Sequence, residues 1–223
     1  MNRLWIGMFA FSFLIGKASV NTESVQNHQT VSEKPATSAV VIAPKNCKAD
    51  KDSVYKEASK VSKDILSKLS KSSKGARKET LVREVSPYFD AKLAAKKVLK
   101  QSDYDKLVKS GHLDTFENLL MERIIDQYSD AVGKISKTTK VNLSKRQFYV
   151  IRKNEVAIGG KIKVKGSQLR LKYRLSCDTS LGKWKIYDIE IEGIGVLKNY
   201  KKQIGSAIKK HGMEKLLKVM AQD

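Results

Sequence analysis

Residues 184–198 read WKIYDIEIEGIGVLK, and this stretch decides how the whole chain is interpreted. A run rich in aromatic and β-branched side chains predicts a strand, Gly193-Ile194-Gly195 follows it, and the remainder has a helical pattern. A strand that passes through Gly-x-Gly into a helix is how a dinucleotide-binding loop begins. The third glycine of that motif would stand at position 198, which is Lys198, and no parallel strand follows. We therefore expect no nucleotide here.

An antiparallel sheet is expected before this corner. From Arg146 onward, apolar side chains alternate with polar ones, which is the period of a strand. Gly166-Ser167 suits a two-residue type II′ turn, in which glycine supplies the positive φ angle. A last strand is predicted over residues 183–192. Successive strands joined by short turns predict an antiparallel meander.

The expected register of the hairpin has a consequence for charge. One face pairs apolar residues with each other, Val164 with Leu169 and Ile162 with Leu171. The other face pairs cations with each other, Lys163 with Arg170 and Lys161 with Lys172. Because like charges directly opposite destabilise a sheet, such a face is either solvated or turned toward an anionic partner.

Helical periodicity precedes the sheet. The first apolar stripe consists of Val54, Ala58, Val61, Ile65 and Leu69, and it ends at Ser72-Ser73-Lys74-Gly75. A second helix is predicted over residues 78–85, before Pro87. Two further stripes follow, first Phe89, Leu93, Ala94 and Val98, then Phe116, Leu119, Leu120, Ile124 and Val132. With a final helix over residues 200–220, this order predicts an α+β fold.

The N-terminus has the pattern of an export signal. Arg3 precedes an apolar run over residues 4–15, and Gly16 and Ala18 are the small residues of a cleavage site. The run is shorter than the roughly 20 residues that cross a bilayer. We expect a signal peptide over residues 1–18 and a flexible linker over residues 19–49, which contain no aromatic residue. The remaining residues, 50–223, form the functional domain.

Charge and cysteine content narrow the class of partner. The 223 residues carry a formal net charge of +21, which favours anionic partners. Export weakens the nucleic-acid interpretation and implies an oxidising compartment. The two cysteines, Cys47 and Cys177, either pair across a very long loop or remain free, and their spacing does not decide between these states.

Catalytic and metal motifs are missing from the sequence. None of the three histidines, His28, His112 and His211, stands in an HExxH or triad-like context, and there is no GxxxxGK[ST] phosphate loop. Asp188, Glu190 and Glu192 are candidates for a paired carboxylate site, but balancing the neighbouring lysines is the more common role of such acids. We expect no enzyme activity, no metal site and no cofactor.

The segment 184–204 resembles the signature of the MlaC family, also called toluene-tolerance or phospholipid-transport auxiliary proteins. The matching segments are Trp184-Lys185-Ile186-Tyr187-Asp188-Ile189, Glu192-Gly193-Ile194-Gly195-Val196-Leu197 and Asn199-Tyr200-Lys201-Lys202-Gln203-Ile204. The family usually has Ser where Gly195 stands, so Gly-x-Gly arises from that substitution. Upstream, Val85-Ser86-Pro87-Tyr88-Phe89-Asp90 and the segment 116–128 resemble further family motifs in the same order.

This resemblance implies a periplasmic phospholipid carrier that acts between the outer and inner membranes and maintains outer-membrane lipid asymmetry. It implies two partners besides phospholipid: an inner-membrane ABC transporter with an MCE-domain subunit, and an outer-membrane lipoprotein–porin complex. The implied fold is a curved antiparallel sheet of about four to five strands, with N-terminal helices and a C-terminal helix packed around an apolar cavity.

The residues then suggest where lipid and partners bind. We expect the lipid site to be lined by apolar residues of the sheet and of the facing helices: Val150, Ile162, Val164, Leu171, Tyr173, Leu175, Leu93, Leu119, Ile124 and Ile208. We expect Lys163, Arg170 and Lys172 to dock partners. Part of the apolar set is ordinary core, and the sequence does not separate the two roles.

Two alternatives stand beside the carrier. One is an exported basic protein that binds anionic surfaces and has a filled core without a lipid cavity. The other is a hydrolase built on a similar sheet, which would require a cavity lined by a paired carboxylate or a histidine.

Overall fold

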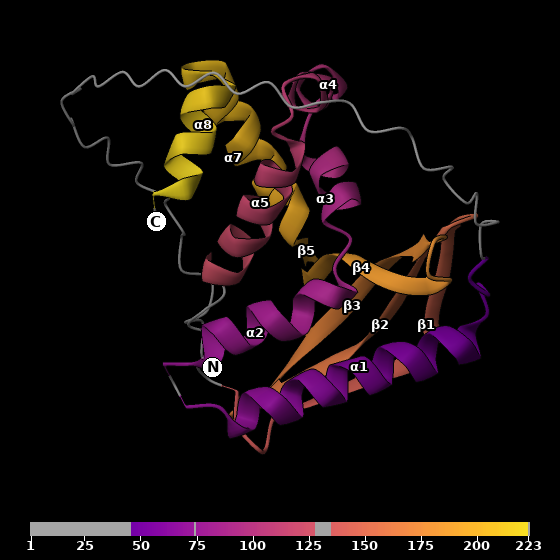
Figure 1. Cartoon of the computed structure of the whole chain (residues 1–223). Coiled ribbons are helices and arrows are strands. Elements are labelled where there is room, and N and C mark those ends of the chain that lie inside the picture. The colour runs from indigo at the N-terminus through magenta and orange to yellow at the C-terminus, as the bar shows by residue number, and fades with distance from the viewer. Residues whose placement is uncertain (1–45, 74, 128–134, 223) are drawn as a thin grey trace, which may run out of the picture. The chain divides into compact units, whose positions relative to one another are not determined.

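The computed structural model describes residues 46–73, 75–127 and 135–222, which belong to one unit, Ile42–Asp223 (Figure 1). The helices are α1 (Lys51–Lys71), α2 (Arg77–Val85), the 3-10 helix η1 (Ser86–Tyr88), α3 (Ala91–Val98), α4 (Gln101–Lys109), α5 (Leu113–Gln127), α7 (Val196–His211) and α8 (Met213–Ala221). The strands are β1 (Lys140–Arg152), β2 (Glu155–Val164), β3 (Ser167–Asp178), β4 (Lys183–Ile191) and β5 (Ile194–Gly195). The predicted signal peptide over residues 1–18, residues 19–45 of the predicted linker and Val132 lie outside the described residues.

Helix α1 begins at a side-chain cap. The carboxylate of Asp50 accepts hydrogen bonds from the backbone N–H groups of Asp52 at 3.1 Å and Ser53 at 2.8 Å, and these donors have no partner within the helix. The predicted apolar stripe buries Val54, Ala58 and Leu69. The first predicted helix is therefore confirmed.

The other predicted helices are found with small changes of boundary. The segments predicted around residues 78–85, 89–98 and 116–124 form α2, α3 and α5. Asp90 caps α3, because its carboxylate accepts a hydrogen bond from the backbone N–H of Leu93 at 2.9 Å. Helix α4 was not predicted, because its apolar residues, Tyr104, Leu107 and Val108, extend over little more than one helical turn.

The five strands form one antiparallel sheet in the order β1-β2-β3-β4-β5. Each strand pairs with the next one in the chain, so the predicted meander and the α+β class are confirmed. Figure 1 shows α1 running alongside this sheet, and α1 packs residues against its apolar face.

Strand β1 is irregular where it passes the two glycines of β2. Its register shifts between Leu143, which faces Gly160, and Phe148, which faces Ile158, so β1 carries extra residues there. A Cβ atom added to Gly160 would lie 2.2 Å from the carbonyl oxygen of Asn142. Only glycine permits this approach. The irregularity also interrupts the alternation, which explains why β1 begins six residues before the predicted start at Arg146.

The hairpin between β2 and β3 turns one residue earlier than predicted. Its central residues are Lys165 and Gly166, with φ angles of 47° and 84°, and Val164 faces Ser167. Positive φ at both central residues is the type I′ geometry, in place of the predicted type II′. The prediction was wrong because a lysine seldom adopts the left-handed region. Ile162 therefore faces Leu169, in place of Leu171.

The Gly-x-Gly corner is a tight turn followed by a helix start. Glu192 and Gly193 have φ angles of 51° and 80° and turn the chain between β4 and β5. Gly195 has extended backbone and occupies the N-cap position of α7. The single helix predicted over residues 200–220 is two helices, because Gly212 has a φ angle of 78° and interrupts it.

The two cysteines form a disulfide. Cys47 and Cys177 are bonded across 130 residues, with their Cα atoms 5.7 Å apart. Beside this bond, the indole N–H of Trp184 donates to the carbonyl oxygen of Lys48 at 3.3 Å. The segment before α1 is thus attached to β3 and β4.

The buried apolar residues form two main clusters. The helical cluster joins α3, α4, α5, α7 and α8, with Phe116 and Leu120 fully buried at its centre. The sheet cluster joins α1 to the sheet around Val156 and Ile158.

Candidate functional site

One face of the sheet is apolar and receives α1. Alternate residues of the four long strands point to this face, as the period of two requires. Its buried members are Leu143, Val156, Ile158, Leu171, Tyr173, Leu175 and Trp184, and α1 adds Val54 and Ala58.

Helix α1 covers this face incompletely. Over its 21 residues α1 buries only Val54, Ala58, Ser62 and Leu69. On the sheet, six apolar side chains that pack against the cluster remain half-buried: Val141, Phe148, Ile162, Ile186, Ile189 and Ile191. Tyr55, Ile65 and Leu66 of α1 are half-buried as well. A row of half-buried apolar side chains offers contact area to an apolar guest.

A pair of hydroxyl groups lies within this otherwise apolar region. Ser62 Oγ and Tyr173 Oη are 3.2 Å apart, and Ser62 Oγ also donates to the carbonyl oxygen of Ala58 at 2.7 Å. Burial raises the pKa of Tyr173, so the phenol is neutral at physiological pH. Satisfied, uncharged hydroxyls are compatible with an apolar site, whereas an unpaired buried charge would not be.

The structure distributes the ten predicted lining residues between two regions. Ile162, Leu171, Tyr173 and Leu175 belong to the sheet cluster. Leu93, Leu119, Ile124 and Ile208 pack, partly buried, against the helical cluster instead. Sequence periodicity identifies apolar faces, but it does not say which helix covers which face. The helix that covers the apolar face of the sheet is α1, which contributed no residue to the predicted lining.

The last two predicted lining residues lie outside both clusters. Val164 is half-buried beside the β2–β3 turn. Val150 faces Val156 in register, but it lies on the edge strand β1 and is 58% exposed. An edge strand has a neighbour on one side only, which leaves Val150 uncovered.

The three predicted docking cations differ in their partners. Lys163 is exposed and faces Lys140 and Gln168 on the neighbouring strands. Arg170 pairs with Glu192 at 3.2 Å, and Lys172 pairs with Glu190 at 2.9 Å. The two predicted like-charge pairs are wrong in register, because the shifted turn places Gln168 opposite Lys163 and Gly159 opposite Lys172. One like-charge pair forms in their place, between Lys161 and Arg170.

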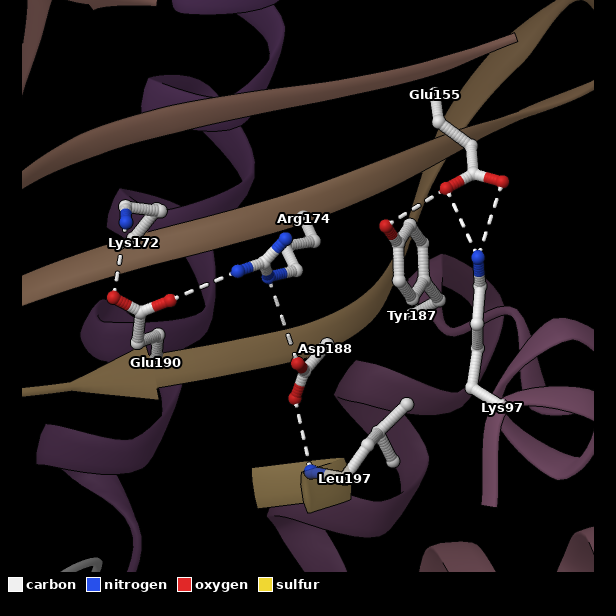
Figure 2. A network of polar contacts seen from close by, with 8 residues as sticks. All are labelled: Lys97, Glu155, Lys172, Arg174, Tyr187, Asp188, Glu190 and Leu197. Atoms are coloured by element: carbon white, nitrogen blue, oxygen red, sulfur yellow. Dashed lines mark hydrogen bonds and ion pairs between the residues drawn. The ribbon is translucent and has the colours of Figure 1, made fainter. Parts of the chain in front are cut away.

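The opposite face of the sheet carries a polar network, drawn in Figure 2. Lys97 of α3 lies 3.2 Å from Glu155 of β2, which also accepts a hydrogen bond from the phenol of Tyr187 at 3.0 Å. Farther along, Glu190 bridges Lys172 and Arg174 at 2.9 and 3.1 Å. The network attaches α3 and stabilises the pairing of β3 with β4.

These contacts shift the ionisation of their members. Burial and the hydrogen bond to Glu155 raise the pKa of Tyr187 to about 12. Burial also raises the pKa of Asp188, and the hydrogen bond from the backbone N–H of Leu197 offsets part of that rise. The pKa of Glu190 is lowered, first by its hydrogen bond to Lys172 and also by Arg174.

The three carboxylates considered for catalysis each have a structural partner. Asp188 lies 3.7 Å from Arg174, Glu190 pairs with Lys172 and Arg174, and Glu192 pairs with Arg170. These pairs are the contacts of sheet-stabilising residues.

The described ranges, 46–73, 75–127 and 135–222, contain neither a metal cluster nor a membrane-spanning helix. Within them, no group of three His, Cys, Asp or Glu side chains is placed to share a metal ion. Within the same ranges, no helix has the length and hydrophobicity that crossing a bilayer requires.

A groove beside α1 is a feature that sequence reasoning missed. Its volume is about 700 Å³, and it is lined by Asp52, Tyr55, Lys56, Ser59, Lys60, Lys63, Asp64 and Lys145. Lys56, Lys60 and Lys63 follow the i, i+4, i+7 spacing of one helix side. That spacing is visible in the sequence, but among 44 basic residues it does not stand out.

The fold is similar to that of a solved protein. The chain matches the phospholipid-binding protein from Ralstonia solanacearum, solved in complex with a phospholipid, with a TM-score of 0.64 and 19% sequence identity. The match covers 77% of this chain and 94% of the other. No curated protein matches the chain. The MlaC protein family, in contrast, matches over residues 56–222, which include the partly covered sheet face and most of α1. The chain therefore belongs to the MlaC family.

Proposed function

We propose that this protein is a periplasmic phospholipid carrier that holds acyl chains against the apolar face of its sheet, beneath α1. The observation that carries the proposal is the incomplete cover of that face, where α1 leaves a row of apolar side chains half-buried. Membership of the MlaC family supports it. The fold shared with the Ralstonia phospholipid-binding protein is consistent with it.

The proposed lining differs from the sequence-based set. It keeps Ile162, Leu171, Tyr173 and Leu175 from the sheet cluster, and it adds Ile189, Ile191 and Tyr55 from the half-buried row. Val150 is left out because it is largely exposed. Leu93, Leu119, Ile124 and Ile208 remain candidates only if the helical cluster opens toward the sheet, where Ile189 packs against both clusters.

Energetics favour exchange with membranes over capture from water. Burying an acyl chain is worth about 0.8 kcal/mol per methylene relative to water. Two chains of roughly 15 methylenes would then give about 24 kcal/mol, which exceeds practical non-covalent affinities. The relevant transfer is from a bilayer to an apolar site, and it is nearly balanced. Such a carrier needs a large apolar surface and no catalytic group, so we propose no enzyme activity.

The proposed compartment is the periplasm. It rests on the export signal expected over residues 1–18, with residues 19–49 as a linker and 50–223 as the lipid-binding domain. The disulfide between Cys47 and Cys177 fits an oxidising compartment.

The proposed partners are those of an ABC-type lipid transport system that maintains outer-membrane asymmetry. They are an inner-membrane transporter with an MCE-domain subunit and an outer-membrane lipoprotein–porin complex. Of the predicted docking cations, Lys163 is the best candidate, because Arg170 and Lys172 are already paired with carboxylates. Its attraction to an acidic partner acts within about 8–10 Å at ordinary salt.

Native mass spectrometry tests this function. The mature protein is purified from a membrane-containing host, sprayed under native conditions, and extracted with solvent to identify any lipid. We expect one bound phospholipid per protein. Protein that is empty, and still empty after incubation with phospholipid vesicles, contradicts the carrier function and favours a basic protein that binds anionic surfaces with a filled core.

A further inference from the structure

The groove beside α1 has the size of a headgroup site and is edged by charged groups. A volume of about 700 Å³ falls within the 300–1,000 Å³ range of small-ligand sites. Every one of its lining side chains carries a charge or a hydroxyl group, including Tyr55. The apolar stems of the lysines form much of its wall, and their ammonium groups give an anion charged partners.

The charge of this groove is positive and incompletely compensated. Four lysines face two aspartates, and one of those aspartates, Asp52, is engaged by Lys145. Within the described part of the chain, no ion pair is found for Lys56, Lys60 or Lys63. Three cations on one helix side, without carboxylate partners, attract an anion.

The groove adjoins the apolar site through one side chain. Tyr55 lines the groove, and its half-buried ring also packs against the sheet cluster. Lys145 belongs to the irregular part of β1, and its ammonium lies 5.3 Å from the centre of the same ring. A single ligand with an anionic end and an apolar end can therefore contact both regions across Tyr55.

We infer that this groove binds the phosphodiester headgroup of the carried lipid and gives the protein a preference for lipids with net negative charge. Lysine is a common ligand of phosphate oxygens. In a zwitterionic headgroup an ammonium offsets the phosphodiester charge, so three lysines favour an anionic lipid over a zwitterionic one. The inference rests on the proposed carrier function and specifies its cargo.

The test replaces the three lysines and measures which lipid is bound. The variant Lys56→Gln/Lys60→Gln/Lys63→Gln removes the unpaired cations from the groove. The control Lys109→Gln/Lys209→Gln/Lys215→Gln removes the same charge from exposed positions on α4, α7 and α8. Each protein is incubated with vesicles of equimolar phosphatidylglycerol and phosphatidylethanolamine, and native mass spectrometry gives the ratio of the two bound lipids.

We expect the wild type and the control to be enriched in phosphatidylglycerol, and the groove variant to lose that enrichment by about a hundredfold, since each of the three lysines contributes about 1 kcal/mol near an anionic lipid surface and each 1.4 kcal/mol is a factor of ten. Two results overturn the inference: an unchanged ratio in the groove variant, or an equal loss in the control. Absence of lipid from all three proteins contradicts the carrier function itself.

A second measurement separates the lipid headgroup from free anions. Inorganic phosphate is titrated into lipid-free wild type by calorimetry. We expect no saturable binding at micromolar phosphate, because free phosphate makes no acyl contacts and its attraction to an open, solvated groove is screened by salt. Saturable micromolar binding that the groove variant loses, in a protein without lipid preference, would assign the groove to a free anion and overturn the headgroup assignment.

Discussion

The carboxylate of Asp188 in β4 accepts a hydrogen bond from the backbone N–H of Leu197 at 3.1 Å, so a strand residue caps the first turn of α7. Gly195 occupies the N-cap position but has no side chain with which to cap. A Cβ atom at Gly195 would lie 3.2 Å from the other carboxylate oxygen of Asp188. Asp188 therefore caps α7 in place of the missing side chain at position 195. A serine at position 195 could supply the same cap locally.

This relationship predicts a rescue. Asp188→Ala should lower the free energy of unfolding by about 1–3 kcal/mol, through the lost cap and the lost contact with Arg174. Adding Gly195→Ser should recover part of that loss, because the backbone there is already extended, as an N-cap requires. Urea unfolding of the two single variants and the double variant gives the coupling. Additive effects of the two changes would contradict the interpretation.

Two glycines of regular elements should respond in opposite directions to the same substitution. Gly160→Ala places a Cβ atom 2.2 Å from the carbonyl oxygen of Asn142, so we expect a loss of about 3 kcal/mol or more. Gly205→Ala, in the interior of α7, meets nothing within 4 Å and should stabilise the protein by about 0.5–1 kcal/mol. Thermal unfolding monitored by circular dichroism compares them. A tolerated Gly160→Ala would mean that β1 can straighten.

Much of the fold is predictable from the sequence because it depends on short-range pattern. Alternating side chains predict the meander, and the stripe from Val54 to Leu69 predicts α1. The turn at Lys165 is missed because a non-glycine residue with positive φ leaves little trace in the sequence. The sequence does not predict the disulfide, because whether Cys47 lies beside Cys177 depends on the topology of the whole domain.

The candidate site is less predictable, for a related reason. Ile162 and Val150 both alternate correctly and lie on the same side of the sheet, yet one is half-buried and the other is 58% exposed. Their difference arises from where α1 lies and from Val150 being on an edge strand. The capping of α7 by Asp188 likewise joins residues nine positions apart through a turn that brings β5 back along β4.

Loss of the disulfide should destabilise the protein without changing its fold. The double variant Cys47→Ser/Cys177→Ser should lose about 2–5 kcal/mol of unfolding free energy, because the bond closes a loop of 130 residues in the unfolded chain. Reductant should lower the stability of the wild type to a similar value. The double variant has no disulfide to reduce, so reductant should leave its free energy of unfolding unchanged. If reductant destabilised the variant as much as the wild type, the effect would not come from this disulfide.

Asp178 should make stability depend on pH. The pKa of Asp178 is held well below its usual value of 3.8, first by the ammonium of Lys185 at 2.8 Å. The hydroxyl of Ser180 and the backbone N–H of Leu181 also donate hydrogen bonds to this carboxylate. A carboxyl whose pKa is lowered by folding stabilises the native state above its unfolded pKa and loses that contribution as pH falls toward the folded pKa. Asp178→Asn should therefore cost about 1–3 kcal/mol at pH 7. The difference should shrink below about pH 4. Urea unfolding at pH 7, 5 and 3 measures it, and a difference that stays constant with pH would contradict the assignment.

The last prediction separates the proposed acyl-chain site from its exposed edge. Ile162→Glu places a carboxylate in the half-buried row beneath α1, where an acyl chain could contact it, and an unpaired charge in an apolar site costs several kcal/mol. We expect phospholipid bound per protein to fall by about tenfold or more, since each 1.4 kcal/mol changes an equilibrium by that factor. Val150→Glu introduces the same charge on the same sheet face at an exposed position, so binding should be unchanged. Native mass spectrometry after incubation with vesicles counts the lipid, and thermal unfolding checks that both variants are folded. Full binding by Ile162→Glu would exclude this face as the site, and equal loss in both variants would extend the site to the edge of β1.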